Sequence, residues 1–112
     1  MFKLPLSLIE WLGQRGIIRR PWLLCVDVSE APLDSGLTPS ILYREVRGGY
    51  PKWAHFACPR CRAHIQIQIA ANSQWRLSVD WLRRPTLHPS IWETESCGAH
   101  FFVRSGGLFW CD

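Results

Sequence analysis

The sequence predicts a mainly β fold of the small α+β class, made of zinc ribbon-like antiparallel hairpins with one short N-terminal helix. One observation is the strict alternation of apolar and polar residues in Ile65-Gln66-Ile67-Gln68-Ile69, the two-residue period of a half-buried strand. Another is a pair of short Cys and His motifs in the second half of the chain. The length of 112 residues, 47% of them apolar, fits a single domain spanning residues 1–112 and excludes a disordered tail.

The N-terminal segment is the only part of the sequence with helical periodicity. Apolar residues recur at helical spacing between residues 6 and 15, and Gly13 and Gly16 then end the pattern. We therefore expect residues 1–20 to form an amphipathic helix followed by a basic segment.

Residues 21–50 are expected to form strands and a loop. The continuous apolar run over residues 22–28 indicates a buried strand, and residues 31–40, rich in Pro, Gly and Ser, indicate a loop. Residues 41–46 look like a second strand, which the Gly-Gly-Tyr-Pro sequence at 48–51 turns back.

Residues 51–112 are expected to form a metal-binding β region. The alternating segments 65–69 and 75–81 suggest a hairpin. Residues 101–104 and 108–110 suggest a second one around Ser-Gly-Gly. Between the two hairpins, a connector bounded by prolines 85 and 89 is expected.

Two short motifs carry the predicted chemistry. Cys58-x-x-Cys61 and Cys97-x-x-His100 each have a spacing that lets a tight turn direct two ligands at one ion. Three thiolates and one imidazole predict one tetrahedral zinc ion. Because such a site is closed to water, we expect a structural role.

Other residues could replace one of these ligands. His55 and His64 flank the first cysteine pair, and Cys111 lies near the end of the last predicted strand. Cys25 lies inside an apolar run and is expected in the core. A thioredoxin-like interpretation of Cys58-Pro-Arg-Cys61 is disfavoured, because a β-patterned segment follows where a helix would be needed.

The sequence does not indicate an enzyme. Glu93, Glu95 and His88 precede the second motif, but they do not form the helical His-Glu-x-x-His arrangement of a metal-dependent hydrolase. No serine lies in the elbow motif of a serine hydrolase. Metal-dependent hydrolysis is therefore only the third of the functions considered.

Charge and aromatic content leave nucleic acid open as a partner. The net charge is +4, and seven tryptophans accompany a basic region around the first cysteine pair, so a nucleic-acid-binding zinc ribbon is the second function considered. The N-terminus shows no small-residue cleavage site and the sequence has no run of apolar residues long enough for a membrane span. We therefore expect a cytoplasmic protein.

The sequence resembles a prokaryotic family of unknown function across residues 41–112. The resemblance is carried by residues 51–61, Trp75-Arg76-Leu77, residues 85–92 and Cys97-Gly-Ala-His-Phe-Phe102. Members of that family are predicted metal binders, and some are encoded beside bacterial ubiquitin-like proteins and their conjugating enzymes.

This resemblance implies ligand roles for the residues of the two short motifs, namely Cys58, Cys61, Cys97 and His100. It also implies a protein partner in a ubiquitin-like modification pathway. The first function that we expect is therefore a zinc-binding adaptor or accessory subunit of such a pathway.

Overall fold

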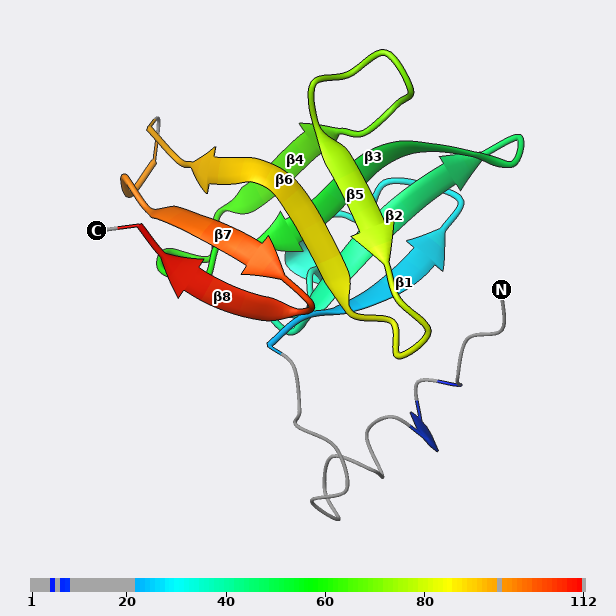
Figure 1. Ribbon diagram of the computed structural model, residues 1–112, viewed down its shortest axis with the longest axis horizontal. Coiled ribbons are helices and arrows are strands. Elements are labelled where there is room, and N and C mark those ends of the chain that lie inside the picture. The colour runs from blue at the N-terminus through cyan, green and yellow to red at the C-terminus, as the bar shows by residue number, and fades with distance from the viewer. Residues whose placement is uncertain (1–4, 6, 9–21, 95, 112) are drawn as a thin grey trace.

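The computed structural model describes residues 5, 7–8, 22–94 and 96–111, and the elements bounded there are eight β-strands and one 3-10 helix. The strands form two four-stranded sheets, in the orders β1-β2-β3-β4 and β5-β6-β7-β8. The second sheet lies in front of the first in Figure 1. The elements are β1 (Leu24–Val28), η1 (Asp34–Gly36), β2 (Ile41–Arg47), β3 (Tyr50–Ala57), β4 (His64–Gln68), β5 (Arg76–Val79), β6 (Pro85–Trp92), β7 (His100–Arg104) and β8 (Gly107–Trp110).

Two tight turns have the backbone conformation that favours hairpins. Gly48 and Gly49 between β2 and β3 have φ values of 59° and 83°, and Ser105 and Gly106 between β7 and β8 have 47° and 76°. Two successive residues with positive φ match the right-handed twist of the flanking strands. The sequence prediction of the β7–β8 hairpin is thus confirmed.

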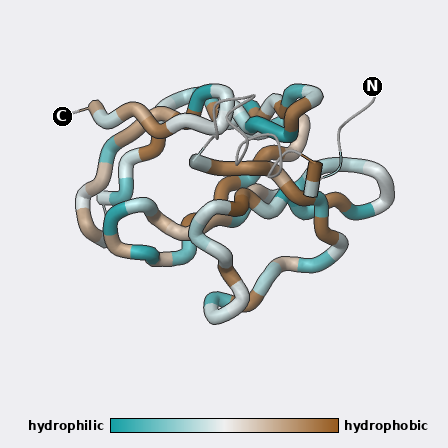
Figure 2. Tube along the Cα trace, turned by 90° about the horizontal axis from the view of Figure 1, so that it is seen from below, coloured by the Kyte–Doolittle hydropathy of each residue, from teal (hydrophilic) through white to brown (hydrophobic). Residues whose placement is uncertain are grey.

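The hydrophobic core fills the space between the two sheets. Phe56 of β3 meets Phe101 of β7 edge to face, with ring centroids 6.3 Å apart, and both side chains are fully buried. Ile65 and Ile67 of β4 also point inward, as the alternation predicted. Figure 2 shows hydrophobic stretches of the chain crossing the middle of the molecule.

The predicted fold class is wrong. Eight of the elements bounded in the described residues are β-strands, and the remaining one is the single 3-10 turn η1. The helix expected between residues 6 and 15 falls almost entirely outside the described residues. The strands form two stacked sheets rather than a zinc ribbon, and β1 pairs with β2 in parallel.

Two predictions about the second half of the chain also fail, one of a strand pairing and one of a connector. The segments 65–69 and 75–81 do not pair, because β4 is hydrogen-bonded to β3 while β5 belongs to the other sheet. Alternation identifies a strand and its buried face, but it leaves the partner open. The expected connector between prolines 85 and 89 is the strand β6, which has an irregularity where Pro89 lies.

Among the described residues, no helix has the length and apolar character that a membrane crossing requires.

Candidate functional site

Three cysteines from two connections come together at one end of the sheets. Cys58 and Cys61 lie between β3 and β4, and Cys97 lies between β6 and β7. Their sulfur atoms are all within 4.8 Å of one another, and those of Cys58 and Cys97 are 3.6 Å apart. Two sulfurs bound to one tetrahedral zinc at 2.3 Å would be about 3.8 Å apart. The three thiols therefore fit a single metal ion.

Backbone geometry fixes the first cysteine turn. The Cys58 N–H donates to the Ala63 carbonyl at 2.8 Å, and the Arg62 N–H donates to the Cys58 carbonyl at 2.9 Å. Arg62 adopts a φ of 65°, which bends the chain back so that Cys61 faces Cys58. The connection of Cys97 is bent in the same way by Gly98, whose φ is 75°.

The environments of the thiols shift their pKa values in opposite directions. Burial raises the pKa of the Cys58 thiol. A hydrogen bond from the Ala63 backbone, with a further one from Cys97, lowers the pKa of the exposed Cys61 thiol to about 7. Because metals bind the thiolate, Cys61 is the thiol best prepared to become a ligand at neutral pH.

His100 is not among the residues whose ligand atoms gather within 4.8 Å of one another. Among the described residues, the cluster that could hold an ion comprises the three cysteines, without His100. The possible substitutes His55, His64 and Cys111 are not members either. Cys25 is buried in the core, as predicted.

His100 instead pairs with a serine on the neighbouring strand. Its Nε2 atom lies 2.9 Å from Oγ of Ser90, and its ring stacks on Trp92 with centroids 5.1 Å apart. A hydroxyl within hydrogen-bonding distance of an imidazole is the arrangement of an activated nucleophile and its general base. Both side chains are half-buried, so solvent reaches the pair.

A bulge in β6 places Ser90. Leu87 pairs with Val103 and Ile91 pairs with Phe101, so three residues of β6 lie opposite one residue of β7. The surplus residues leave the regular ladder at Ser90. Bulges often reorient a side chain beside an active site.

The two other histidines considered as ligands belong to a separate chain of hydrogen bonds. His55 Nε2 lies 2.9 Å from the buried carboxylate of Glu45, and His55 Nδ1 lies 2.9 Å from His64 Nε2. His64 Nδ1 lies 2.6 Å from Asp34 in η1. These contacts link β2, β3 and β4 to the loop that covers them, which indicates a structural role.

The sequence alone missed the Ser90–His100 pair. Ten positions separate the two residues, and they meet only because β6 and β7 are neighbours. The nucleophile elbow of serine hydrolases places the serine between a strand and a helix, whereas Ser90 lies inside a strand. The available signal was the strand before the second cysteine motif, which its two prolines concealed.

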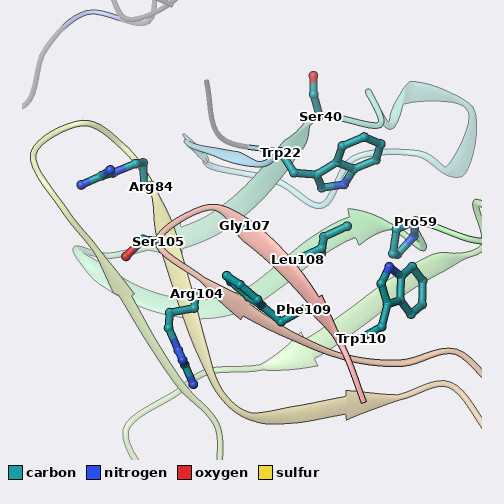
Figure 3. Close-up of a pocket in the computed structure, with 10 residues that line it drawn as sticks. All are labelled: Trp22, Ser40, Pro59, Arg84, Arg104, Ser105, Gly107, Leu108, Phe109 and Trp110. Atoms are coloured by element: carbon teal, nitrogen blue, oxygen red, sulfur yellow. The ribbon is translucent and has the colours of Figure 1, made fainter. Parts of the chain in front are cut away.

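A broad hollow of about 920 Å³ lies elsewhere on the second sheet. Figure 3 shows Trp110 beside Pro59 of the cysteine turn, with Arg84 and Arg104 at the other end. Arg60 lies over the Trp110 ring, 4.6 Å from its centroid. The hollow does not include Ser90 or His100 among its lining residues.

Comparison with curated proteins and with solved structures finds no match. A family comparison does find one, over residues 28–111, which include all three cysteines and the Ser90–His100 pair. The family is described as "Bacterial ubiquitination-like system serine protease (BubE)". This match confirms the resemblance to a family linked to bacterial ubiquitin-like systems, and the chain belongs to the BubE family.

Proposed function

We propose that this chain is a serine hydrolase that cleaves peptide bonds in a bacterial ubiquitination-like system. The observation that carries the proposal is the 2.9 Å contact between Ser90 Oγ and His100 Nε2. The description of the family as a serine protease also supports the proposal. A serine protease needs a serine hydroxyl beside a histidine base, and Ser90 and His100 provide both.

The pair supplies the two roles needed for acyl transfer. His100 Nε2 accepts the Ser90 hydroxyl proton as Oγ attacks the substrate carbonyl carbon. The protonated His100 then gives that proton to the leaving amine as the bond to the carbonyl breaks. Water then attacks the acyl carbon while His100 takes its proton, and His100 returns that proton to Ser90 Oγ as the acyl–oxygen bond breaks. The stack on Trp92 holds the imidazole ring in one orientation during these steps.

We further propose that Cys58, Cys61 and Cys97 bind one zinc ion, whose structural role rests on the crosslink between two connections and not on a closed set of four protein ligands. Support comes from the distances among their sulfurs and from the preference of zinc for thiolate ligands. When bound, zinc would supply a crosslink between the two connections. In this proposal His100 acts as the base, and its predicted role as fourth ligand is the alternative that a lower metal content of a His100→Ala variant would support.

Replacement of the nucleophile tests the proposed activity. We expect Ser90→Ala to reduce hydrolysis of p-nitrophenyl acetate by about a thousandfold or more, because the attacking oxygen is lost. His100→Ala should reduce it similarly. Ser78→Ala, which alters an exposed serine on β5, is the matched control and should hydrolyse the ester at the wild-type rate.

The same experiment distinguishes the proposed hydrolase from the adaptor that the sequence predicts. An adaptor in the ubiquitination-like system needs a folded surface and no nucleophile. Ester hydrolysis that is absent in the wild type, or unchanged in Ser90→Ala, would contradict the hydrolase and favour the adaptor.

A further inference from the structure

Strand β4 has an open side. It lies at the edge of the first sheet, where its only neighbour within that sheet is β3. A groove of about 560 Å³ runs along it. One wall of this groove is the edge strand itself, from Ile65 to Gln68, and the facing wall includes Ile91, Trp92 and Glu93.

The register shows which backbone groups face the groove. The Cys58 N–H donates to Ala63, and the Ile69 N–H donates to Lys52, so hydrogen-bonded pairs occur at both ends of the β3–β4 ladder. In an antiparallel ladder these pairs alternate with pairs whose N–H and C=O groups point outward. Every second residue of β4 therefore forms backbone hydrogen bonds with β3, and within the strand these residues are Ile65 and Ile67.

The residues between them therefore direct their backbone away from β3. These are Gln66 and Gln68, which pair with His55 and Trp53. The Gln68 carbonyl confirms this direction, because it accepts the Ser73 hydroxyl at 2.5 Å. The Gln66 N–H and C=O and the Gln68 N–H thus face the groove at the two-residue spacing of a β-strand.

The groove is lined by two residues that neighbour the proposed Ser90–His100 dyad, Ile91 and Trp92. Ile91 follows Ser90 directly, and Trp92 stacks on His100. The Trp92 side chain is 63% exposed, and it both lines the groove and contacts the His100 ring. A chain lying in the groove would therefore contact the residue that stacks on the proposed base.

We propose that the substrate of this hydrolase is an extended, unfolded peptide segment, which binds as an added β-strand along the open edge of β4. Main-chain hydrogen bonds to Gln66 and Gln68 give such binding its affinity with little dependence on sequence. This inference rests on the proposed function, since it assigns the substrate class of the same site. A folded surface would not reach these backbone groups inside the groove.

Removal of one backbone donor tests the proposal. Gln66→Pro deletes an N–H that faces the groove and leaves the β3–β4 ladder intact, since edge strands accept proline at such positions. Gln66→Ala is the matched control, because it removes the side chain and keeps the N–H. Two probes are compared by mass spectrometry: a small alkyl fluorophosphonate, and the same warhead at the carboxyl end of acetylated tetra-alanine. In both, Ser90 Oγ bonds to phosphorus, fluoride leaves and His100 takes the proton.

We expect the peptide probe to label wild type and Gln66→Ala faster than the small probe does. In Gln66→Pro, labelling by the peptide probe should slow about tenfold, while labelling by the small probe is unchanged. Equal rates of peptide labelling in Gln66→Pro and Gln66→Ala would overturn the inference, as would a wild type that reacts no faster with the peptide probe. If Gln66→Pro loses labelling by the small probe as well, Gln68→Pro replaces it. Failure of both probes to label Ser90 in the wild type would instead overturn the proposed function.

Discussion

At the scale of single residues, the thiols of the cysteine group differ sharply in acidity. Cys61 is exposed and its pKa is lowered to about 7, whereas burial raises the pKa of Cys58. A cysteine whose pKa lies at about 7 is partly thiolate at neutral pH, and the thiolate is the nucleophilic form. The residue that gives up its proton first is therefore the one that solvent and metal reach most easily.

This difference predicts the order of alkylation in metal-free protein. The rate of Cys61 modification by iodoacetamide should rise with pH and reach half its maximum at about pH 7, with Cys58 reacting only at higher pH. Peptide mapping by mass spectrometry measures both rates. A Cys61 profile centred near the ordinary thiol value of 9.0 would contradict the prediction.

The lowered pKa of Cys61 also predicts the direction in which metal affinity changes with pH. Ions displace protons from thiols, so metal affinity should fall as the pH falls below the pKa of Cys61, at about 7. Zinc should also protect Cys61 from iodoacetamide, which makes protection a second readout of the same site.

Residue spacing revealed one part of the site and concealed the other. The cysteine motifs could be found because each ligand pair is local, so the sequence already encodes the turn that brings them together. Ser90 and His100 are brought together by the pairing of two strands and by a bulge. Neither the pairing nor the bulge has a local signature, so the sequence spacing indicated only a ligand role for His100.

At the scale of elements, strands β2 and β3 share a buried hydrogen bond between Glu45 and His55. Glu45 and His55 are 2% and 0% exposed, and Glu45 also contacts Arg47 at 2.7 Å. The carboxylate is thus removed from water and depends on its partners for solvation.

We expect His55→Phe to lower the free energy of unfolding by about 3 kcal/mol, because it leaves the Glu45 carboxylate buried with one partner fewer. The double variant Glu45→Leu with His55→Phe should recover part of that loss. Urea denaturation measures all three proteins. Asp27→Asn, which alters a carboxylate that is 54% exposed, is the comparison and should cost less than about 1 kcal/mol. A His55→Phe cost no larger than that of Asp27→Asn would contradict the structural role of the contact.

Element identity was predicted better than element partners. The apolar run before Val28 and the segment from Ile41 are strands, as predicted, because continuous or alternating apolar residues suffice to identify them. Strand β6 was missed because proline is rare within ladders, and here Pro89 lies in the irregular part of the strand. A sequence pattern indicates which face of a strand is buried. Many different strand pairings bury that same face, so the pattern does not identify the partner strand.

At the scale of the whole molecule, the cysteine group joins the two sheets. Cys58 and Cys61 extend from the first sheet and Cys97 from the second, so an ion bound among them would crosslink both. The prediction of a hairpin between 65–69 and 75–81 could not anticipate this, because it placed both segments in one sheet. The stacking of separate sheets depends on the whole core, with Phe56 on one side and Phe101 on the other.

The crosslink predicts a large effect of metal removal on stability. We expect one zinc per wild-type chain by elemental analysis, and a fall in Tm of several degrees or more when a chelator removes it, since structural zinc contributes directly to folding. Cys97→Ser should lose the zinc and show the lower Tm without chelator. Cys111→Ser, which lies outside the cysteine group, is the matched control and should keep both. Full zinc content in Cys97→Ser would contradict the assignment.

The segment that links β6 to β7 begins just after Trp92, carries Cys97 and ends at His100. One short stretch of chain therefore anchors the proposed ion and also positions the proposed base. If the anchor is withdrawn, the imidazole loses its support, and turnover would slow even though the ion takes no part in bond cleavage. Inhibition by a chelating agent would then make the proposed serine hydrolase resemble a metallopeptidase in a routine inhibitor screen.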